Sequence, residues 1–166
     1  MDSPAASSDL DQEADAEPNT DQAPDSKLAP YIADGFVVEQ EHVFTHDFEG
    51  IGELTVTPVT SFGITGQFPV ALILTGEEKE IVLTPDREPG HPMFSSFEAI
   101  SFKDIDADGA SAGFTDIIAI ANFITGVGQD GATPFSDVFI FRNDGNGGFT
   151  EDTELEQRII EAAGSR

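Results

Sequence analysis

Short apolar segments separated by turn residues occupy the chain from residue 36 to residue 142, and they constrain the fold more than any other feature. The two strongest segments are residues 68–74 and 80–83, and the Gly-Glu-Glu-Lys sequence at residues 76–79 between them predicts a hairpin turn. A loop with three prolines follows at residues 85–92. Further strands are expected at residues 36–38, 43–44, 54–57, 97–103, 116–124 and 137–142.

One helix is expected near the C-terminus, over residues 152–163, and Gly164 ends it. Either Asp152 or Thr153 is placed to cap its first turn. The apolar face of this helix is expected to consist of Leu155, Ile159 and Ile160, which recur at helical spacing.

The predicted fold class is therefore mainly β (α+β): an antiparallel sheet domain over residues 30–166 with one C-terminal helix. Residues 1–29 differ in composition, with eight acidic residues, one lysine and no aromatic residue. Such a segment buries too little apolar surface to offset its chain entropy, so we expect a disordered acidic leader. Its role is either that of a stalk, with a lipid anchor upstream of residue 1, or that of an ordinary disordered end.

The chain carries 32 acidic and 7 basic residues, which gives a formal charge of −25. This charge excludes nucleic acid and anionic lipid as partners and favours cations or a basic protein. Adaptation to a salty habitat is an alternative cause of the acidity. No apolar run reaches the ~18 residues of a membrane span, and any export signal would lie upstream of residue 1. The chain also contains no cysteine, so a thiolate metal site is excluded.

The segment Asp-Ile-Asp-Ala-Asp-Gly at residues 104–109 predicts a calcium site. Carboxylates at alternate positions repel one another unless a cation lies among them, and the glycine permits the sharp turn around that cation. An EF-hand is excluded because Thr115 stands at the twelfth position, where that loop needs glutamate, and a strand follows. The predicted calcium ligands are Asp104, Asp106, Asp108, the backbone carbonyl of Ala110, and Asp116.

These residues resemble the calcium loops of FG-GAP and VCBS-type repeats, the blades of integrin-like β-propellers. The family pattern is Asp-x-Asp-x-Asp-Gly-x-x-Asp, followed by a strand and later by Asn-Asp-Gly-x-Gly-x-Phe. The chain matches it with the loop at 104–109 and with residues 143–149, although Asp116 stands four positions later than the pattern places its last aspartate. The resemblance covers residues 97–150, about one blade, and implies calcium as the cofactor. Extracellular calcium modules fill at roughly 10⁻⁴–10⁻³ M, so we expect a periplasmic, cell-envelope or secreted protein.

A long loop is expected at residues 125–136, between two strands. Its Gly-x-Gly-x-x-Gly sequence at residues 126–131 matches a dinucleotide fingerprint but lacks the helix that this site requires. Loops of this length are often functional, so we expect a partner-binding loop. Phe135 alternatively packs back onto the sheet. The candidate contact residues are Thr125, Val127, Asp130 and Phe135.

These observations together predict an extracytoplasmic calcium-binding domain that binds a protein and is not an enzyme. A specific version is an inhibitor or immunity protein of a basic peptidoglycan hydrolase, because the chain is also similar to bacterial lysozyme-inhibitor-like calcium-loop β-domains. One alternative is a carbohydrate-binding or adhesion module, which the lack of tryptophan and the single Tyr31 disfavour. The other alternative is a hydrolase, for which no nucleophile motif is present.

Overall fold

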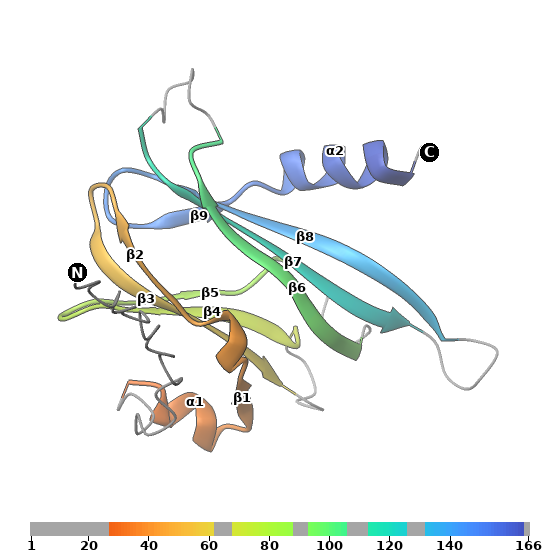
Figure 1. Ribbon diagram of the computed structural model, residues 1–166, viewed down its shortest axis with the longest axis horizontal. Coiled ribbons are helices and arrows are strands. Elements are labelled where there is room, and N and C mark those ends of the chain that lie inside the picture. Colours follow the sequence, from red (N-terminus) through yellow and green to blue (C-terminus); the bar gives the residue numbers. More distant parts are fainter. Residues whose placement is uncertain (1–26, 62–67, 88–92, 106–112, 126–131, 165–166) are drawn as a thin grey trace, which may run out of the picture.

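The computed structural model describes residues 27–61, 68–87, 93–105, 113–125 and 132–164, which form two antiparallel sheets in two layers (Figure 1). The fold class predicted from the sequence, mainly β with a C-terminal helix, is confirmed. The first sheet contains β1 (Phe36–Val38), β2 (Phe44–Phe48), β3 (Gly52–Ser61), β4 (Val70–Thr75) and β5 (Glu80–Leu83). The second contains β6 (Met93–Lys103), β7 (Asp116–Thr125), β8 (Thr133–Asn143) and β9 (Phe149–Glu151). The helical segments are α1 (Ala29–Ala33), the 3₁₀ helix η1 (Gln40–His42) and α2 (Thr153–Gly164).

In the first sheet, β3 pairs with β4 along one side and with two short strands along the other. Residues 52–56 pair with β2, and residues 59–61 pair with β1. Pro58 lies between these two pairings, and its carbonyl oxygen accepts the N–H of Glu39 at 3.0 Å. The missing N–H of Pro58 therefore falls in the gap between β2 and β1, so no ladder hydrogen bond is lost.

Strand β4 is apolar along almost its whole length because both of its faces are covered. Leu72 and Leu74 point into the main core between the two sheets. Ala71 and Ile73 point the other way, into a second core under α1 and β1. A strand buried on both faces reads as a continuous apolar run, which explains why this strand gave the strongest signal in the sequence.

The second sheet is a meander in which each strand pairs with the next along the chain, in the order β6-β7-β8-β9. A four-stranded antiparallel sheet is also the unit of a propeller blade, and here its inner face packs on the first sheet. Alternate residues of β7, from Ile117 to Phe123, point into the main core. Phe123 is completely buried and contacts the rings of Phe68, Phe94 and Phe139. This aromatic cluster ties both sheets together.

The N-terminal end of the described chain packs under the first sheet, beside α1. Leu28 is buried in the second core, where Tyr31 packs against it. The Nζ of Lys27 donates hydrogen bonds to the carbonyl oxygens of Gly76 and Glu77. The described structure thus includes residues 27–29, which precede the domain start expected at residue 30. Residues 1–26 of the expected leader lie outside the described residues.

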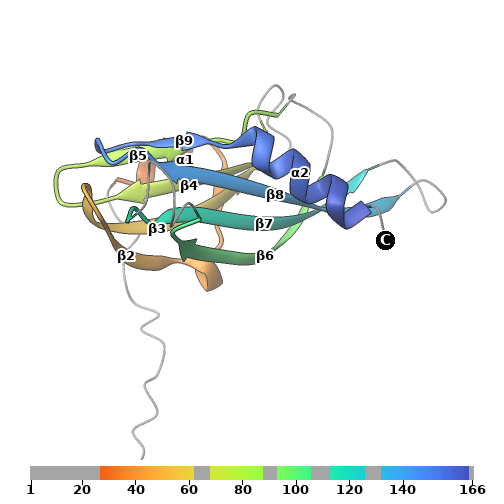
Figure 2. The same ribbon diagram turned by 90° about the horizontal axis from the view of Figure 1, so that it is seen from above.

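Helix α2 packs beside β8 (Figures 1 and 2), and its apolar residues are not part of either core. Ile159 and Ile160 are exposed, and Leu155 is only half-buried. The side chain that α2 buries is that of Glu156. Helical spacing alone therefore did not indicate which α2 side chain is buried, and α2 is held beside β8 by the polar contacts of Glu156 and Asp152.

Candidate functional site

Strand β9 is shorter than β8 and pairs with only one end of it. Beyond that end, the start of α2 supplies the hydrogen-bond partners that a neighbouring strand would supply. Strand β9 pairs only with residues 141–143 of β8. The N–H of Asp152 donates to the carbonyl oxygen of Ile140 at 2.8 Å, and Asp152 Oδ1 accepts the N–H of Leu155 at 3.0 Å. Asp152 is thus the helix cap, one of the two residues predicted for that role. The same residue fixes the helix to the edge of the sheet.

Glu156, one turn further along, completes this attachment. Its side chain is 2% exposed, and its Oε1 accepts the N–H of Ile140 at 2.7 Å. Its Oε2 accepts Nη2 of Arg87 at 2.8 Å. Both backbone groups of Ile140 are therefore satisfied by α2, as a buried sheet edge requires.

Arg87 lies at the centre of a group of four ionised side chains, which we call the Arg87 cluster: Arg87, Asp137, Glu151 and Glu156. Its Nε donates to Asp137 Oδ2 at 3.1 Å, and its Nη1 donates to Glu151 Oε1 at 3.2 Å. The guanidinium also lies 5.2 Å from the ring centroid of Phe139, a distance at which a cation is attracted to the ring face. One side chain thereby joins the segment after β5 to β8, β9 and α2.

Two members of the Arg87 cluster, Arg87 and Glu156, have raised pKa values, and the cause differs between them. Burial lowers the pKa of Arg87, but the hydrogen bonds and charges of Glu156 and Asp137 outweigh it and hold that pKa above its ordinary value. Burial raises the pKa of Glu156, and the hydrogen bonds from Ile140 and Arg87 offset only part of that effect. Three carboxylates share one guanidinium, so the cluster carries an excess of negative charge.

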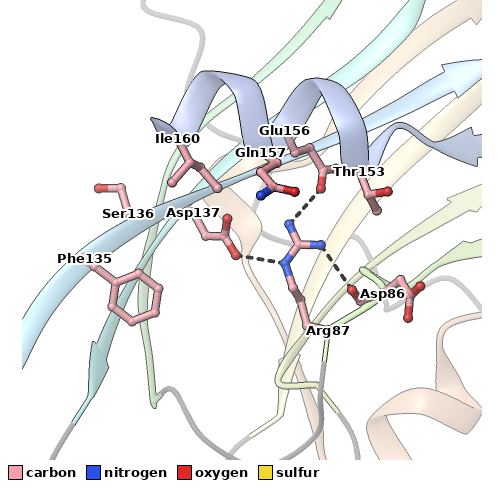
Figure 3. Close-up of a pocket in the computed structure, with 9 residues that line it drawn as sticks. All are labelled: Asp86, Arg87, Phe135, Ser136, Asp137, Thr153, Glu156, Gln157 and Ile160. Carbon is pink, nitrogen blue, oxygen red and sulfur yellow. Dashed lines mark hydrogen bonds and ion pairs between the residues drawn. The ribbon is translucent and has the colours of Figure 1, made fainter. Parts of the chain in front are cut away.

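Beside this cluster lies an open pocket of about 540 Å³, between α2 and the edge of β8 (Figure 3). Two apolar side chains form its walls: Phe135 on β8 is 39% exposed, and Ile160 on α2 is 44% exposed. The pocket therefore combines exposed apolar surface with an acidic base. Its lining residues are Asp86, Arg87, Phe135, Ser136, Asp137, Thr153, Glu156, Gln157 and Ile160.

The partner-binding loop predicted at residues 125–136 is shorter than expected, because both of its ends belong to strands. Thr125 pairs with Thr133, and Phe135 pairs with Phe123. The rings of Phe135 and Phe123 stack with centroids 5.6 Å apart. Phe135 thus packs on the sheet, as one of the two interpretations expected, and still lines the pocket; its contact with a partner stays a prediction. The alternating polar residues near Phe135 concealed the strand, and Val127 and Asp130 lie outside the described residues.

Two of the predicted calcium ligands, Asp104 and Asp116, lie within the described residues, at the two ends of the aspartate loop. Asp104 Oδ2 accepts the N–H of Gly113 at 2.7 Å, and Asp116 Oδ2 accepts the N–H of Ile105 at 3.0 Å. These two bonds cross-tie the ends of the loop. Asp106, Asp108 and Ala110 lie outside the described residues, so the calcium site stays a prediction. No other group of three metal-binding side chains is present within the described ranges.

Asp116 is buried, and its charge is balanced by contacts within the protein. The side chain is 2% exposed; Oδ1 accepts the N–H of Asn143 at 2.9 Å, and Oδ2 lies 3.4 Å from Nη1 of Arg142. Arg142 Nε lies 3.6 Å from Asp152 Oδ2, at the cap of α2. A cation bound by Asp116 would share this carboxylate with Arg142. The aspartate loop and α2 are therefore joined through one arginine.

The two residues that precede Asp116 at the end of the aspartate loop, Phe114 and Thr115, also contact other turns, including the one between β8 and β9. The N–H of Thr115 donates to Glu49 Oε2 at 3.0 Å. The ring of Phe114 lies against Gly145, which has a φ of +68°. A Cβ at Gly145 would lie 2.6 Å from that ring, so both the backbone conformation and the close contact require glycine. The glycine-rich turn that matches the repeat pattern thus has a packing role.

Sequence analysis did not identify the Arg87 cluster. Its four members come from separate segments, and no local spacing relates Arg87 to Glu156. The one available signal was the scarcity of cations, since only seven basic residues accompany 32 acidic ones. An arginine in such a chain is surrounded by carboxylates, but the sequence does not say which ones.

Comparison with known proteins gives no match to any family model, curated protein or solved structure. Within the described part of the chain, no helix has the length and apolar character needed to cross a bilayer. Any functional argument for this chain therefore depends on its own residues.

The raised pKa of Glu156 predicts a specific dependence of stability on pH. A carboxyl group with a raised pKa in the folded state stabilises the fold below its ordinary pKa of 4.5, and this contribution is lost as pH rises through the raised value. Glu156→Gln removes the titration and keeps an oxygen for the N–H of Ile140. The free energy of unfolding of the wild type, relative to this variant, should therefore decrease as pH rises above 4.5. Urea denaturation across that range measures it.

Glu154→Gln provides the matched control, because Glu154 is an exposed residue of the same helix. This variant shows how much of the effect comes from the loss of any carboxylate on α2. Parallel stability curves for the wild type and Glu156→Gln would contradict the assignment of Glu156 as a buried, charge-bearing attachment.

Proposed function

We propose that this chain is a binding domain that docks a basic protein through the pocket between α2 and β8. The observation that carries the proposal is the pocket itself, where exposed Phe135 and Ile160 stand beside an acidic cluster. Apolar side chains flanked by charge are the usual composition of a binding hot spot. The Arg87 cluster supplies the negative potential, and the two apolar side chains supply the surface to be desolvated.

The overall charge of the chain supports a basic partner. A charge of −25 attracts a basic protein over long distances and accelerates its association. Binding is favoured over catalysis because the pocket carboxylates Asp137 and Glu156 already accept hydrogen bonds from Arg87 and the backbone. A general acid or base needs a carboxyl group that is available to a substrate.

Calcium and location form the second part of the proposal. The loop at residues 104–116 binds calcium through Asp104, Asp106, Asp108, Ala110 and Asp116, and the ion stabilises the domain. The cross-tied loop ends at Asp104 and Asp116 support this role, because they hold the loop closed at its base. Since weak calcium sites fill outside the cytosol, the protein acts in the periplasm, in the envelope or after secretion. A lysozyme-type peptidoglycan hydrolase is a basic enzyme of that compartment, and the chain acts as its inhibitor or immunity protein.

Docking at the pocket predicts that a lysozyme-type hydrolase binds the wild-type chain and that Phe135→Ala and Ile160→Ala each weaken the complex. Loss of a desolvated apolar contact at a hot spot costs about 2 kcal/mol, a roughly thirtyfold rise in Kd. Ile32→Ala is the matched control, since Ile32 on α1 is 41% exposed and lies away from the pocket. Its Kd should equal that of the wild type. Isothermal titration calorimetry gives all four values.

Absence of any complex with the hydrolase would eliminate that enzyme as the partner. Equal weakening by Ile32→Ala and Ile160→Ala would remove the pocket as the docking surface.

Calcium binding predicts that the melting temperature is higher with calcium than with a chelator, because the ion binds only the folded loop. Asp106→Ala should abolish this difference and leave a folded, less stable domain. Asp34→Ala, a change at an exposed aspartate after α1, should preserve it. Differential scanning calorimetry with and without chelator makes the measurement. Identical melting of the wild type in the two conditions would show that the loop binds no calcium.

A further inference from the structure

We infer that the pocket accepts an extended basic segment of the partner, which adds as a strand to the free edge of β8 at Ser136. This inference rests on the proposed function and specifies its mode: backbone pairing with β8, with a cationic side chain directed to the acidic cluster. Strand addition uses main-chain hydrogen bonds for affinity and side-chain pockets for specificity.

The alternation of β8 shows which backbone groups face this edge. The pairing of β7 with β8 runs without a register shift from Ile117↔Phe141 to Thr125↔Thr133. Both backbone groups of Ile140 bond to α2, and the carbonyl oxygen of Val138 accepts Nη2 of Arg87 at 3.4 Å. Residues 140 and 138 therefore face away from β7. The backbone N–H and C=O groups of successive residues point to opposite edges of a strand. The backbone groups of Ser136 and Pro134 therefore point to the same open edge as those of residues 138 and 140.

Ser136 presents the one outward N–H of this stretch that remains available. Among the described residues, its backbone N–H and carbonyl oxygen have no partner beyond β8, whereas its Oγ donates to Asn122 Oδ1 at 2.7 Å. Pro134 has no N–H to offer. An added strand can therefore exchange a pair of backbone hydrogen bonds with β8 only at Ser136. This single pairing fixes the register of the added strand.

The pocket supplies places for the side chains of the added strand. Successive side chains of a strand point to opposite faces. On one side of the edge lie Phe135, Asp137 and Asp86, and on the other side α2 presents Ile160 and Gln157 (Figure 3). A lysine or arginine on the first side would pack its stem against Phe135 and bring its charge to the carboxylates. An apolar residue on the second side would cover Ile160.

Charge decides among the possible occupants of this edge. A second copy of the chain carries the same charge of −25, and residues 1–26 of the chain carry eight acidic groups and no basic one. Both would be repelled by the excess carboxylates of the Arg87 cluster. A basic segment of another protein is attracted, so this occupant is the one that the pocket fits.

Ser136→Pro tests backbone pairing without a change of charge. The variant removes the outward N–H of residue 136. Strand β8 already contains a proline on the same edge, Pro134, two residues earlier. No hydrogen bond to β7 is lost, because the Ser136 N–H faces away from that strand. Ser136→Ala is the matched control, since it keeps the N–H and removes only the hydroxyl group.

The probe is a fluorescein-labelled short peptide of alternating lysine and valine, and anisotropy titration measures its Kd. Binding to the wild type and to Ser136→Ala should be equal, and Ser136→Pro should raise Kd about tenfold. The same peptide N-methylated at its central residues keeps its charge and side chains but cannot pair, so it should bind the wild type about tenfold more weakly. A peptide of alternating glutamate and valine should not bind.

Non-specific attraction between opposite charges would leave the affinity unchanged by Ser136→Pro and by N-methylation, and that result overturns strand addition. Failure of the lysine–valine peptide to bind the wild type also overturns it. Circular dichroism checks that Ser136→Pro is folded, and if it is not, the N-methylated peptide with the wild-type chain decides. The docking surface itself is judged separately by the hydrolase titrations with Phe135→Ala and Ile160→Ala, so the two proposals fail independently.

Discussion

The position of α2 depends on one partly buried cation, Arg87, which holds three carboxylates from three different elements. Glu156 would be buried without charge compensation if Arg87 were absent, and an unpaired buried charge is strongly destabilising. The same guanidinium connects the segment that leaves the first sheet to the edge of the second. The main core holds the two sheets together through apolar packing, whereas α2 is held by hydrogen bonds to Ile140 and by the ion pair with Arg87.

This polar attachment determines what the surface of the molecule offers. A helix docked through apolar residues would bury Ile159 and Ile160, but α2 leaves both exposed because Glu156 and Asp152 make its contacts. Exposed Ile160, the outward side of Phe135 and the excess negative charge then occur at one place. Arg142 extends the polar connections to the base of the aspartate loop, through Asp116 and Asp152. The proposed calcium site and the proposed docking surface are thus neighbours in one network.

The sequence predicted the parts of the fold that depend on local patterns. Residues 36–38 and 80–83 are strands with the expected bounds, and the cap of α2 is one of the two residues expected. Residues 133–136 were missed because an exposed edge strand with a proline lacks an apolar signal. Helical spacing predicted which apolar residues share a face of α2, but it did not show that Glu156 is the residue that α2 buries. The Arg87 cluster joins residues up to 69 positions apart, and only the fold brings them together.

Hydrogen exchange of Arg87→Met tests this account most directly, because methionine keeps an apolar stem and removes the charge that pairs with Glu156. The account predicts that the amides of α2 and of Ile140 exchange at least about tenfold faster than in the wild type, while the amides of β7 keep their protection. Unchanged protection in α2 would show that the helix does not depend on Arg87. Equal loss of protection in α2 and β7 would also contradict the account, because the charge cluster would then support the whole core and not the helix alone.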